Sequence, residues 1–297
     1  MKVISSYSIK GGVGKTSLAV NLAFALCEAG QRTLLLDLDP QGAAAFYFRV
    51  GNAEKFRMRD AHSIADGLYR NIRESDFPGL DIIPSNIGFR HFDIVLDGMA
   101  KRRKQLRMIL EELKSDYDVV LLDCPPNITL LSENIFKASD AILVPVIPTV
   151  LSRRTLEQLT GFFREEDLPC EILRPFFSMV QKRSKMHREI MAELPALQPG
   201  FLKTVIPFSA EVEKMGLRRM PLLAYSHTCE AALAYRALCD EILSQLGWGT
   251  MKHTASVGMT RSPAASTAAT ATAAPSTSAP ARTSPAIAAP AGVTAIP

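Results

Sequence analysis

Residues 8–23 read "SIKGGVGKTSLAVNLA", and this stretch decides the fold. Its glycine-rich loop follows an apolar, β-branched run at 2–9 and leads into a helical pattern that stops at Gly30. Backbone N–H groups of such a loop, together with the N-terminus of the following helix, form a nest that binds phosphate. The G-x-x-x-x-G-K-[ST] pattern is met except at its first glycine, where the chain has Ile9. The predicted phosphate-binding residues are Gly11, Gly12, Val13, Gly14, Lys15, Thr16 and Ser17.

Strand-like and helix-like runs alternate along the rest of the chain. Several of the strand-like runs are continuously apolar, as strands covered on both faces must be. The predicted strands are 2–9, 32–39, 80–85, 118–123, 141–147, 174–180 and 202–207, and further helices are predicted at 101–115, 130–139, 153–165, 185–194 and 227–246. This alternation predicts an α/β fold with a mainly parallel, doubly wound sheet and a P-loop at its carboxyl edge.

Composition divides the chain near residue 249. The part beyond it is rich in Ala, Thr, Ser and Pro and has almost no large apolar residues, so residues 250–297 are expected to be a disordered tail. Residues 1–249 are expected to form one domain, which holds 31 basic and 30 acidic residues. Nucleic-acid binding must therefore rest on local patches. The chain opens on a strand, its five cysteines form no C-x-x-C pair, and no apolar run could span a bilayer, so a cytoplasmic protein is expected.

Carboxylates follow two of the predicted strands. Asp37 and Asp39 end the run "LLLDLDPQG", and Asp123 ends "DVVLLD". Because the carboxyl ends of parallel strands meet at one edge of a sheet, these groups should converge on the phosphate loop. Lys15 would contact the β- and γ-phosphates, the Thr16 hydroxyl would bind Mg²⁺, and Asp123 would hold that ion in the manner of a Walker-B aspartate.

The set "KGGVGKTS", "LLLDLDPQG" and "YDVVLLDCPP" resembles the deviant Walker-A ATPases of the ParA/MinD family, in particular the chromosomal, Soj-like branch and its orphan relatives. The resemblance continues through "VPVIPTVLSRRTLEQL" and "KTVIPFSAEV" and covers roughly residues 1–246. It implies an ATPase that works with ATP and Mg²⁺. The absence of an N-K-x-D guanine-reading motif agrees with ATP rather than GTP.

The resemblance also assigns roles to individual residues. Lys10 would cross the interface of an ATP-bound homodimer and contact the phosphates of the partner, so that Lys10, Lys15 and Asp39 form the catalytic set. Asp39 would orient or activate the attacking water, and Thr16, Asp39 and Asp123 would lie on the metal side of the site. Adenine would lie near the loops after 174–180 and 202–207, with Pro207 and Phe208 as candidate contacts.

Three features separate the branches of the family. Nitrogenase iron protein shares the loop and binds a cluster through cysteines, but Cys124 has no suitable second cysteine, so a buried thiol is favoured. The segment after 249 has neither the apolar stripe nor the basic face of a MinD-like membrane helix. An N-terminal helix-turn-helix domain is also excluded, because a strand begins at residue 2.

Nonspecific DNA binding by the ATP dimer is then implied. Basic clusters occur at 101–107, 181–188 and 216–221, and a basic run is often only a solvated surface, as 101–107 could be. The family binds DNA through C-terminal basic residues, but its second basic position is Glu213 here. The candidate DNA-binding residues are Arg183, Lys185, Lys214, Arg218 and Arg219.

The resemblance therefore predicts a slow ATPase that positions a chromosome, plasmid or protein assembly on the nucleoid. ATP would drive dimerisation and DNA binding, and a ParB-like or adaptor protein would stimulate hydrolysis. Two alternatives stay open. One is a regulatory switch that binds a partner protein without DNA, as a cellulose-synthesis accessory factor does. The other is a MinD-like ATPase that cycles on membranes, for which the chain lacks the anchor.

Overall fold

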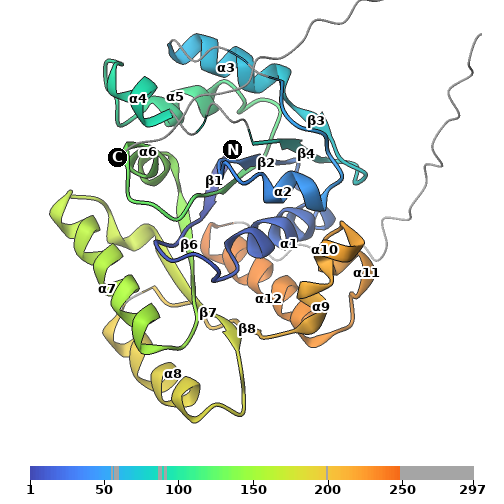
Figure 1. Ribbon diagram of the computed structural model, residues 1–297, viewed down its shortest axis with the longest axis vertical. Coiled ribbons are helices and arrows are strands. Elements are labelled where there is room, and N and C mark those ends of the chain that lie inside the picture. Colours follow the sequence, from blue (N-terminus) through green and yellow to red (C-terminus); the bar gives the residue numbers. More distant parts are fainter. Residues whose placement is uncertain (55, 57–59, 86–88, 90–91, 199, 248–297) are drawn as a thin grey trace, which may run out of the picture. The chain divides into compact units, whose positions relative to one another are not determined.

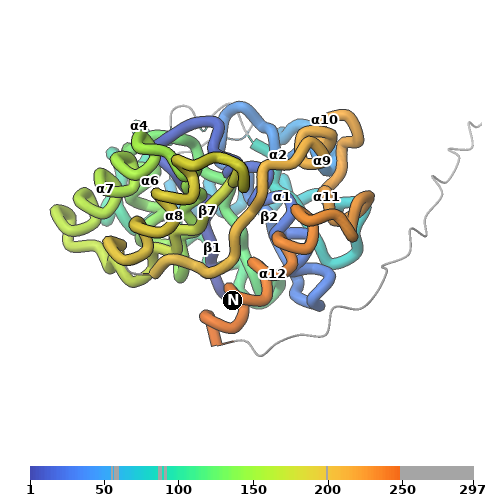
Figure 2. Tube along the Cα trace, turned by 90° about the horizontal axis from the view of Figure 1, so that it is seen from below, coloured from blue at the N-terminus to red at the C-terminus, as the bar shows by residue number. Residues whose placement is uncertain are grey.

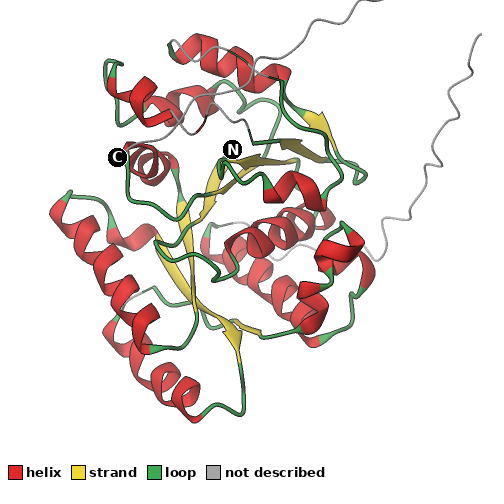
Figure 3. Ribbon diagram, in the orientation of Figure 1, coloured by secondary structure: helices red, strands yellow, loops and turns green. Residues whose placement is uncertain are grey.

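The computed structural model describes residues 1–54, 56, 60–85, 89, 92–198 and 200–247. An eight-stranded sheet with the order β3-β4-β2-β5-β1-β6-β7-β8 forms the centre of this part (Figure 3). Every neighbouring pair is parallel except β3 with β4. The strands are β1 Lys2–Ser6, β2 Thr33–Asp37, β3 Arg73–Glu74, β4 Leu80–Ile83, β5 Val119–Asp123, β6 Ala141–Val146, β7 Leu173–Val180 and β8 Val205–Pro207.

Helices cover both faces of the sheet (Figures 1 and 2). One face packs against α1 Lys15–Glu28, α2 Ala43–Tyr47, α9 Ala210–Glu213, α10 Met215–Arg218, α11 Leu222–Tyr225 and α12 Glu230–Gln245. The other packs against α3 Ala61–Arg70, α4 Phe92–Asp97, α5 Gln105–Glu111, α6 Leu130–Ala138, α7 Val150–Glu165 and α8 Lys185–Leu197. A short 3₁₀ helix, Cys170–Ile172, precedes β7. No helix in the described part is long and apolar enough to cross a membrane.

The side chains of the central strands alternate between two cores. In β2, Leu34 and Leu36 join the core beneath α3 to α8, whereas Leu35 joins the core beneath α1 and α12. In β5, Val120 and Leu122 face the first core, and Leu121 faces the second. A strand whose side chains enter a core on each face of the sheet must be apolar at every position. This requirement explains the continuous apolar runs of the sequence.

The predicted fold class is confirmed. All seven predicted strands are present, most of them shorter at the ends, and β3 is an additional two-residue strand. The predicted helix 101–115 is wrong in extent, because α5 spans only Gln105–Glu111. Lys101 has a left-handed backbone with φ 51°, which an α-helix cannot include. Helices α2, α3, α4, α9, α10 and α11 were not predicted, and the tail predicted at 250–297 lies outside the described residues.

Candidate active site

Three strand ends meet beside the phosphate loop. In the register of the sheet Asp123, at the end of β5, lies opposite Ser6 of β1 on one side and Asp37 of β2 on the other. The loop that leaves β1 enters α1 at Lys15, whose ammonium lies close enough to Asp123 to affect the pKa of that carboxyl. The convergence predicted from the strand ends is therefore present, and it results from the central position of β5 between β1 and β2.

The loop has the backbone that a phosphate nest requires. Gly12 and Gly14 have φ values of 70° and 96°, a region that glycine enters without cost. Gly14 is also the N-cap of α1 and has no side chain to accept the N–H groups of the first turn. These N–H groups, at the positive end of the helix dipole, suit an anionic ligand.

The two lysines of the loop lie in different environments. Lys15 is only 8% exposed, and its Nζ donates to the Lys10 carbonyl oxygen at 3.3 Å. Burial lowers the pKa of Lys15, while the nearby Asp123 opposes that shift. The Lys10 side chain is half-buried and, among the described residues, forms no hydrogen bond or ion pair. Lys15 is therefore fixed inside the loop, and Lys10 is available for a further contact.

Asp123 is a buried carboxylate that lies near the Thr16 hydroxyl but accepts no hydrogen bond of ordinary geometry from the described residues. Both of its oxygens are buried, and neither accepts a hydrogen bond within the described part of the chain. Burial raises its pKa to about 7, and the charge of Asp39 adds to this shift. The Thr16 hydroxyl and the Lys15 ammonium both counteract it. An unsatisfied buried carboxylate is costly unless a cation compensates it. Asp123, with Thr16 in the first turn of α1, thus fits a small divalent cation such as Mg²⁺.

The structure separates the two aspartates of "LLLDLDPQG". Asp37 is fully buried and accepts the backbone N–H groups of Asp39 at 3.2 Å and of Ala44 at 3.0 Å. Burial and the charge of Asp123 raise its pKa. Asp39 lies on the loop beyond β2, is only half-buried, and uses one oxygen to accept the Gln41 N–H at 3.0 Å. Asp37 holds the loop in place, and the second oxygen of Asp39 accepts no hydrogen bond within the described part of the chain.

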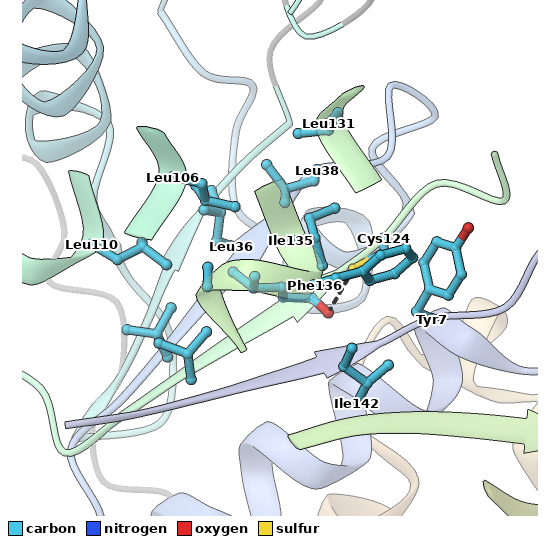
Figure 4. Close-up of a cluster of buried hydrophobic side chains, with 14 of the residues drawn as sticks. Tyr7, Leu36, Leu38, Leu106, Leu110, Cys124, Leu131, Ile135, Phe136 and Ile142 are labelled. Carbon is cyan, nitrogen blue, oxygen red and sulfur yellow. Dashed lines mark hydrogen bonds between the residues drawn. The ribbon is translucent and has the colours of Figure 1, made fainter. Parts of the chain in front are cut away.

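Cys124 belongs to the apolar core. Its sulfur lies among apolar side chains near Tyr7 and Phe136, and its thiol donates to the Leu122 carbonyl oxygen at 3.5 Å (Figure 4). Burial raises the pKa of this thiol well above its ordinary value. Across the described residues, no group of three or more His, Cys, Asp or Glu side chains could hold a metal ion.

The candidate adenine contacts lie at the end of the outermost strand. Pro207 ends β8, and Phe208 follows it with half of its side chain exposed. The Phe208 N–H donates to the Val180 carbonyl oxygen at 3.0 Å, which fixes this residue to the carboxyl end of β7. The two residues are on the correct edge of the sheet, and their role in binding adenine stays a prediction.

The candidate DNA-binding residues form two groups. Arg183 and Lys185 lie at the start of α8, whereas the other three lie on or beside α9 and α10, and these helices stand apart in Figures 1 and 2. All five are exposed. Lys185 pairs with Glu189 and Lys214 pairs with Glu211, which lowers the free positive charge of each group. The five residues do not form one patch on a single protomer.

The basic run 101–107 is largely neutralised. Arg103 forms ion pairs with Glu133 at 2.6 Å and Glu166 at 2.8 Å, and Arg102 pairs with Asp97. Arg107 pairs with Glu111 and Asp140. The three arginines of the run are therefore salt-bridged and tie α5 to its neighbours, as expected for a solvated surface, and whether the run binds DNA stays a prediction.

Sequence reasoning did not single out two serines that contact the loop, Ser6 and Ser178. Ser6 donates to the Lys15 carbonyl oxygen at 2.9 Å, and Ser178 donates to the Val13 carbonyl oxygen at 3.1 Å. A serine within a strand has no distinctive pattern, and only the tertiary arrangement brings both to the loop.

Comparison with known proteins places the chain among partition ATPases. A family model described as an AAA domain matches residues 1–167. The chain is 29% identical over 258 residues to the chromosome partitioning protein ParA of Caulobacter vibrioides, covering 82% of this chain and 95% of that protein. It is 33% identical over 247 residues to the cell division protein PomZ of Myxococcus xanthus, covering 80% and 77%. A plasmid partition protein of Borrelia burgdorferi, solved with AMPPNP, superposes with a TM-score of 0.68 at 22% identity, covering 82% and 99%.

Proposed function

We propose that this chain, which belongs to the ParA/MinD family of P-loop ATPases, is a partition ATPase that dimerises on ATP and positions a cargo on DNA. The observation that carries the proposal is the buried Asp123 carboxylate, which accepts no hydrogen bond of ordinary geometry within the described residues, beside a glycine loop with a buried lysine. A carboxylate in this state needs a cation, and the loop beside it needs an anion. A magnesium nucleotide supplies both.

Each residue of the site has a distinct task in ATP hydrolysis. The loop from Gly11 to Ser17 would bind the phosphates, and Lys15 would balance their charge at a position from which water is excluded. Thr16 and Asp123 would hold Mg²⁺, which when bound neutralises charge on the transferred phosphoryl group. Asp39, with one oxygen unused, would orient the attacking water.

Lys10 links hydrolysis to dimerisation. Its side chain lies free of hydrogen bonds within the described residues, while its carbonyl oxygen receives Lys15 Nζ. A second cation that reaches the phosphates only from a partner protomer would stabilise the charge that develops in the transition state. This arrangement would keep the isolated monomer slow and make the dimer the active species.

Binding to DNA would follow from dimerisation. Residues 1–249, proposed here as the ATPase domain, are close to neutral, and the basic groups at α8 and α10 are separate on one protomer. A dimer doubles both groups and could lay them along one duplex, so that affinity would depend on ATP. The protein would then be cytoplasmic and associated with the nucleoid.

The cargo and the stimulating partner are left open by this proposal. The relatives act in chromosome partitioning and in cell division, so a ParB-like protein or another adaptor fits equally well.

One observation favours a switch that works without DNA. Arg218 lies over the ring of Tyr225 and Arg219 lies over that of Phe46, so both are already engaged within the protein.

Light scattering with Mg²⁺ and ATP, ADP or no nucleotide tests the dimer. Asp39→Ala should bind ATP without hydrolysing it, so its mass should double from 32.5 kDa in ATP alone. Lys15→Gln, which cannot balance the phosphate charge, should stay monomeric under the same conditions. If Asp39→Ala remains monomeric at saturating ATP, the proposed dimer cycle is wrong.

A further inference from the structure

A side chain from a distant strand holds the centre of the phosphate loop. Ser178 lies on β7, is only 5% exposed, and donates its hydroxyl to the Val13 carbonyl oxygen at 3.1 Å. A Cβ placed on Gly14 would come within 3.3 Å of Ser178 Oγ and 3.5 Å of Met179 Cε. The loop therefore rests directly on β7. Position 14 favours glycine because of its φ of 96°, and a Cβ there would be tight against Ser178 Oγ.

The geometry of the peptide bond gives this contact a consequence for ligand binding. In a planar trans peptide the carbonyl and the following N–H point in opposite directions. When Ser178 holds the Val13 carbonyl against β7, the Gly14 N–H must point the other way, into the nest. Without this bond the peptide between Val13 and Gly14 could rotate, because glycine at position 14 allows many backbone conformations.

Strand β7 is deformed at the point of contact. Met179, the residue after Ser178, has a left-handed backbone with φ 53°, and the pairing of β7 with β8 shifts register between Phe177 and Val180. Irregularities of this kind re-aim a side chain, and a non-glycine residue keeps such a conformation only when its surroundings enforce it. The deformation coincides with the residues that contact Val13 and Gly14.

Ser6 makes a similar contact on the other side of the loop. Its hydroxyl donates to the Lys15 carbonyl oxygen at 2.9 Å, which directs the Thr16 N–H. Lys15 already belongs to the first turn of α1, whose own hydrogen bonds help to hold that peptide. The peptide between Val13 and Gly14 lies before the helix and lacks this support. Its orientation therefore depends more strongly on the hydrogen bond from Ser178.

We propose that Ser178 is a positioning residue for the nucleotide: its hydroxyl orients the Gly14 N–H toward the phosphates that the loop binds. The inference rests on the proposed function, since it presupposes a phosphate ligand in the loop. It differs from a purely structural role, in which the bond would tie β7 to the loop and add only to the stability of the fold.

Variants with matched controls distinguish the two roles. Ser178→Ala removes the donor, and Ser178→Thr restores it. Ser139→Ala removes another buried hydroxyl, which lies before the amino end of β6. This hydroxyl donates to the Ile135 carbonyl oxygen at 2.7 Å and shares a hydrogen bond with Ser5 Oγ, but within the described residues it forms no hydrogen bond with the phosphate loop. The affinities for ATP and ADP are measured by calorimetry with Mg²⁺, and stability is measured by urea unfolding.

Ser178→Ala should bind ATP and ADP roughly tenfold more weakly, the effect of one misdirected hydrogen bond to a charged ligand. Its KM should rise while its kcat stays within about twofold, because the lost contact serves ground and transition states alike. Ser178→Thr and Ser139→Ala should bind as the wild type does. If Ser178→Ala fails to fold, Ser178→Cys, which keeps only a weak donor, takes its place with a smaller expected loss.

Equal nucleotide affinity for the wild type and for Ser178→Ala would overturn the positioning role. A loss of affinity in Ser139→Ala that matches the loss in Ser178→Ala would also overturn it, because the effect would then follow general stability. If the wild type itself binds neither ATP nor ADP, the proposed function fails first, and that result is distinct from both others.

Discussion

The free energy of unfolding of the nucleotide-free protein should fall as the pH rises from 5 to 8, and this fall should be smaller in the variant Asp123→Asn. Burial raises the pKa of Asp123 to about 7, whereas the same carboxyl in an unfolded chain has a pKa of about 3.9. The folded state therefore keeps a proton that the unfolded state releases. The contribution of this proton to the free energy of unfolding is therefore fully present below the unfolded pKa. It is lost as the pH rises from the unfolded pKa to the folded pKa.

The two pKa values set the size of the effect. The linkage relation gives a loss of about 1 to 2 kcal/mol at pH 5 and about 4 kcal/mol at pH 8, a step of about 2 to 3 kcal/mol between them. The charge of Asp123 also raises the pKa of Asp37, which lies opposite it in the sheet. Removing the Asp123 charge should therefore also lower the pKa of Asp37 toward its ordinary value. This change further reduces the fall in the free energy of unfolding between pH 5 and pH 8.

Urea unfolding at pH 5 and pH 8, in EDTA and without nucleotide, measures this step. The free energy of unfolding of the wild type should fall by at least about 2 kcal/mol more than that of Asp123→Asn. Adding Mg²⁺ with nucleotide at pH 8 should restore the wild type, because the cation compensates the buried charge, and should restore the variant much less. An identical pH dependence in both proteins would refute the assignment of Asp123 as an uncompensated cation ligand.

Three further predictions follow from the site. Lys15→Gln should bind ATP roughly 100-fold more weakly, because about 3 kcal/mol of charged hydrogen bonding is lost. Lys10→Ala should bind ATP with normal affinity in titrations but hydrolyse it poorly. Equal losses of affinity in both would contradict the separate role of Lys10. Cys124→Ala should lower the free energy of unfolding by about 1–2 kcal/mol and keep ATPase activity in a steady-state assay; an inactive but stable variant would give the thiol a chemical role. A protein ending at residue 249 should keep its ATPase activity and melt within about 3 °C of the full chain, unless 250–297 packs on the domain.

The sheet was predictable because strands that are buried on both faces have continuously apolar sequences. Strands such as β2 and β5 must be apolar throughout, and their short length, with a proline shortly after each, distinguishes them from a buried helix such as α1. The two-residue strand β3 has no pattern of its own, and its position depends on pairing with β4. The start of α5 at Gln105 was not predictable, because ion pairs of Arg103 with two other helices hold the preceding turn.

The residues of the site were predictable from the sequence, but their burial and their contacts were not. Asp37 and Asp39 look equivalent in "LLLDLDPQG", yet the register places Asp37 opposite Asp123 and leaves Asp39 on the loop. Lys10 and Lys15 both belong to the loop motif, and only the structure shows which one is buried. Ser178 is 165 residues from Val13, so its contact depends on the order of strands in the sheet.

Binding to a random-sequence DNA duplex tests the central proposal most directly. Gel shifts with ATP, ADP and no nucleotide, over a series of salt concentrations, compare the wild type with a protein in which Arg183, Arg218 and Arg219 are each replaced by Glu. Binding should require ATP, should be the same for scrambled duplexes, and should weaken with salt with a log–log slope of about −0.9 for each neutralised phosphate. The triple variant should lose DNA binding and keep its basal ATPase activity. If the ATP-bound wild type binds DNA no better than the nucleotide-free protein at low salt, DNA positioning is contradicted and the protein-only switch takes its place.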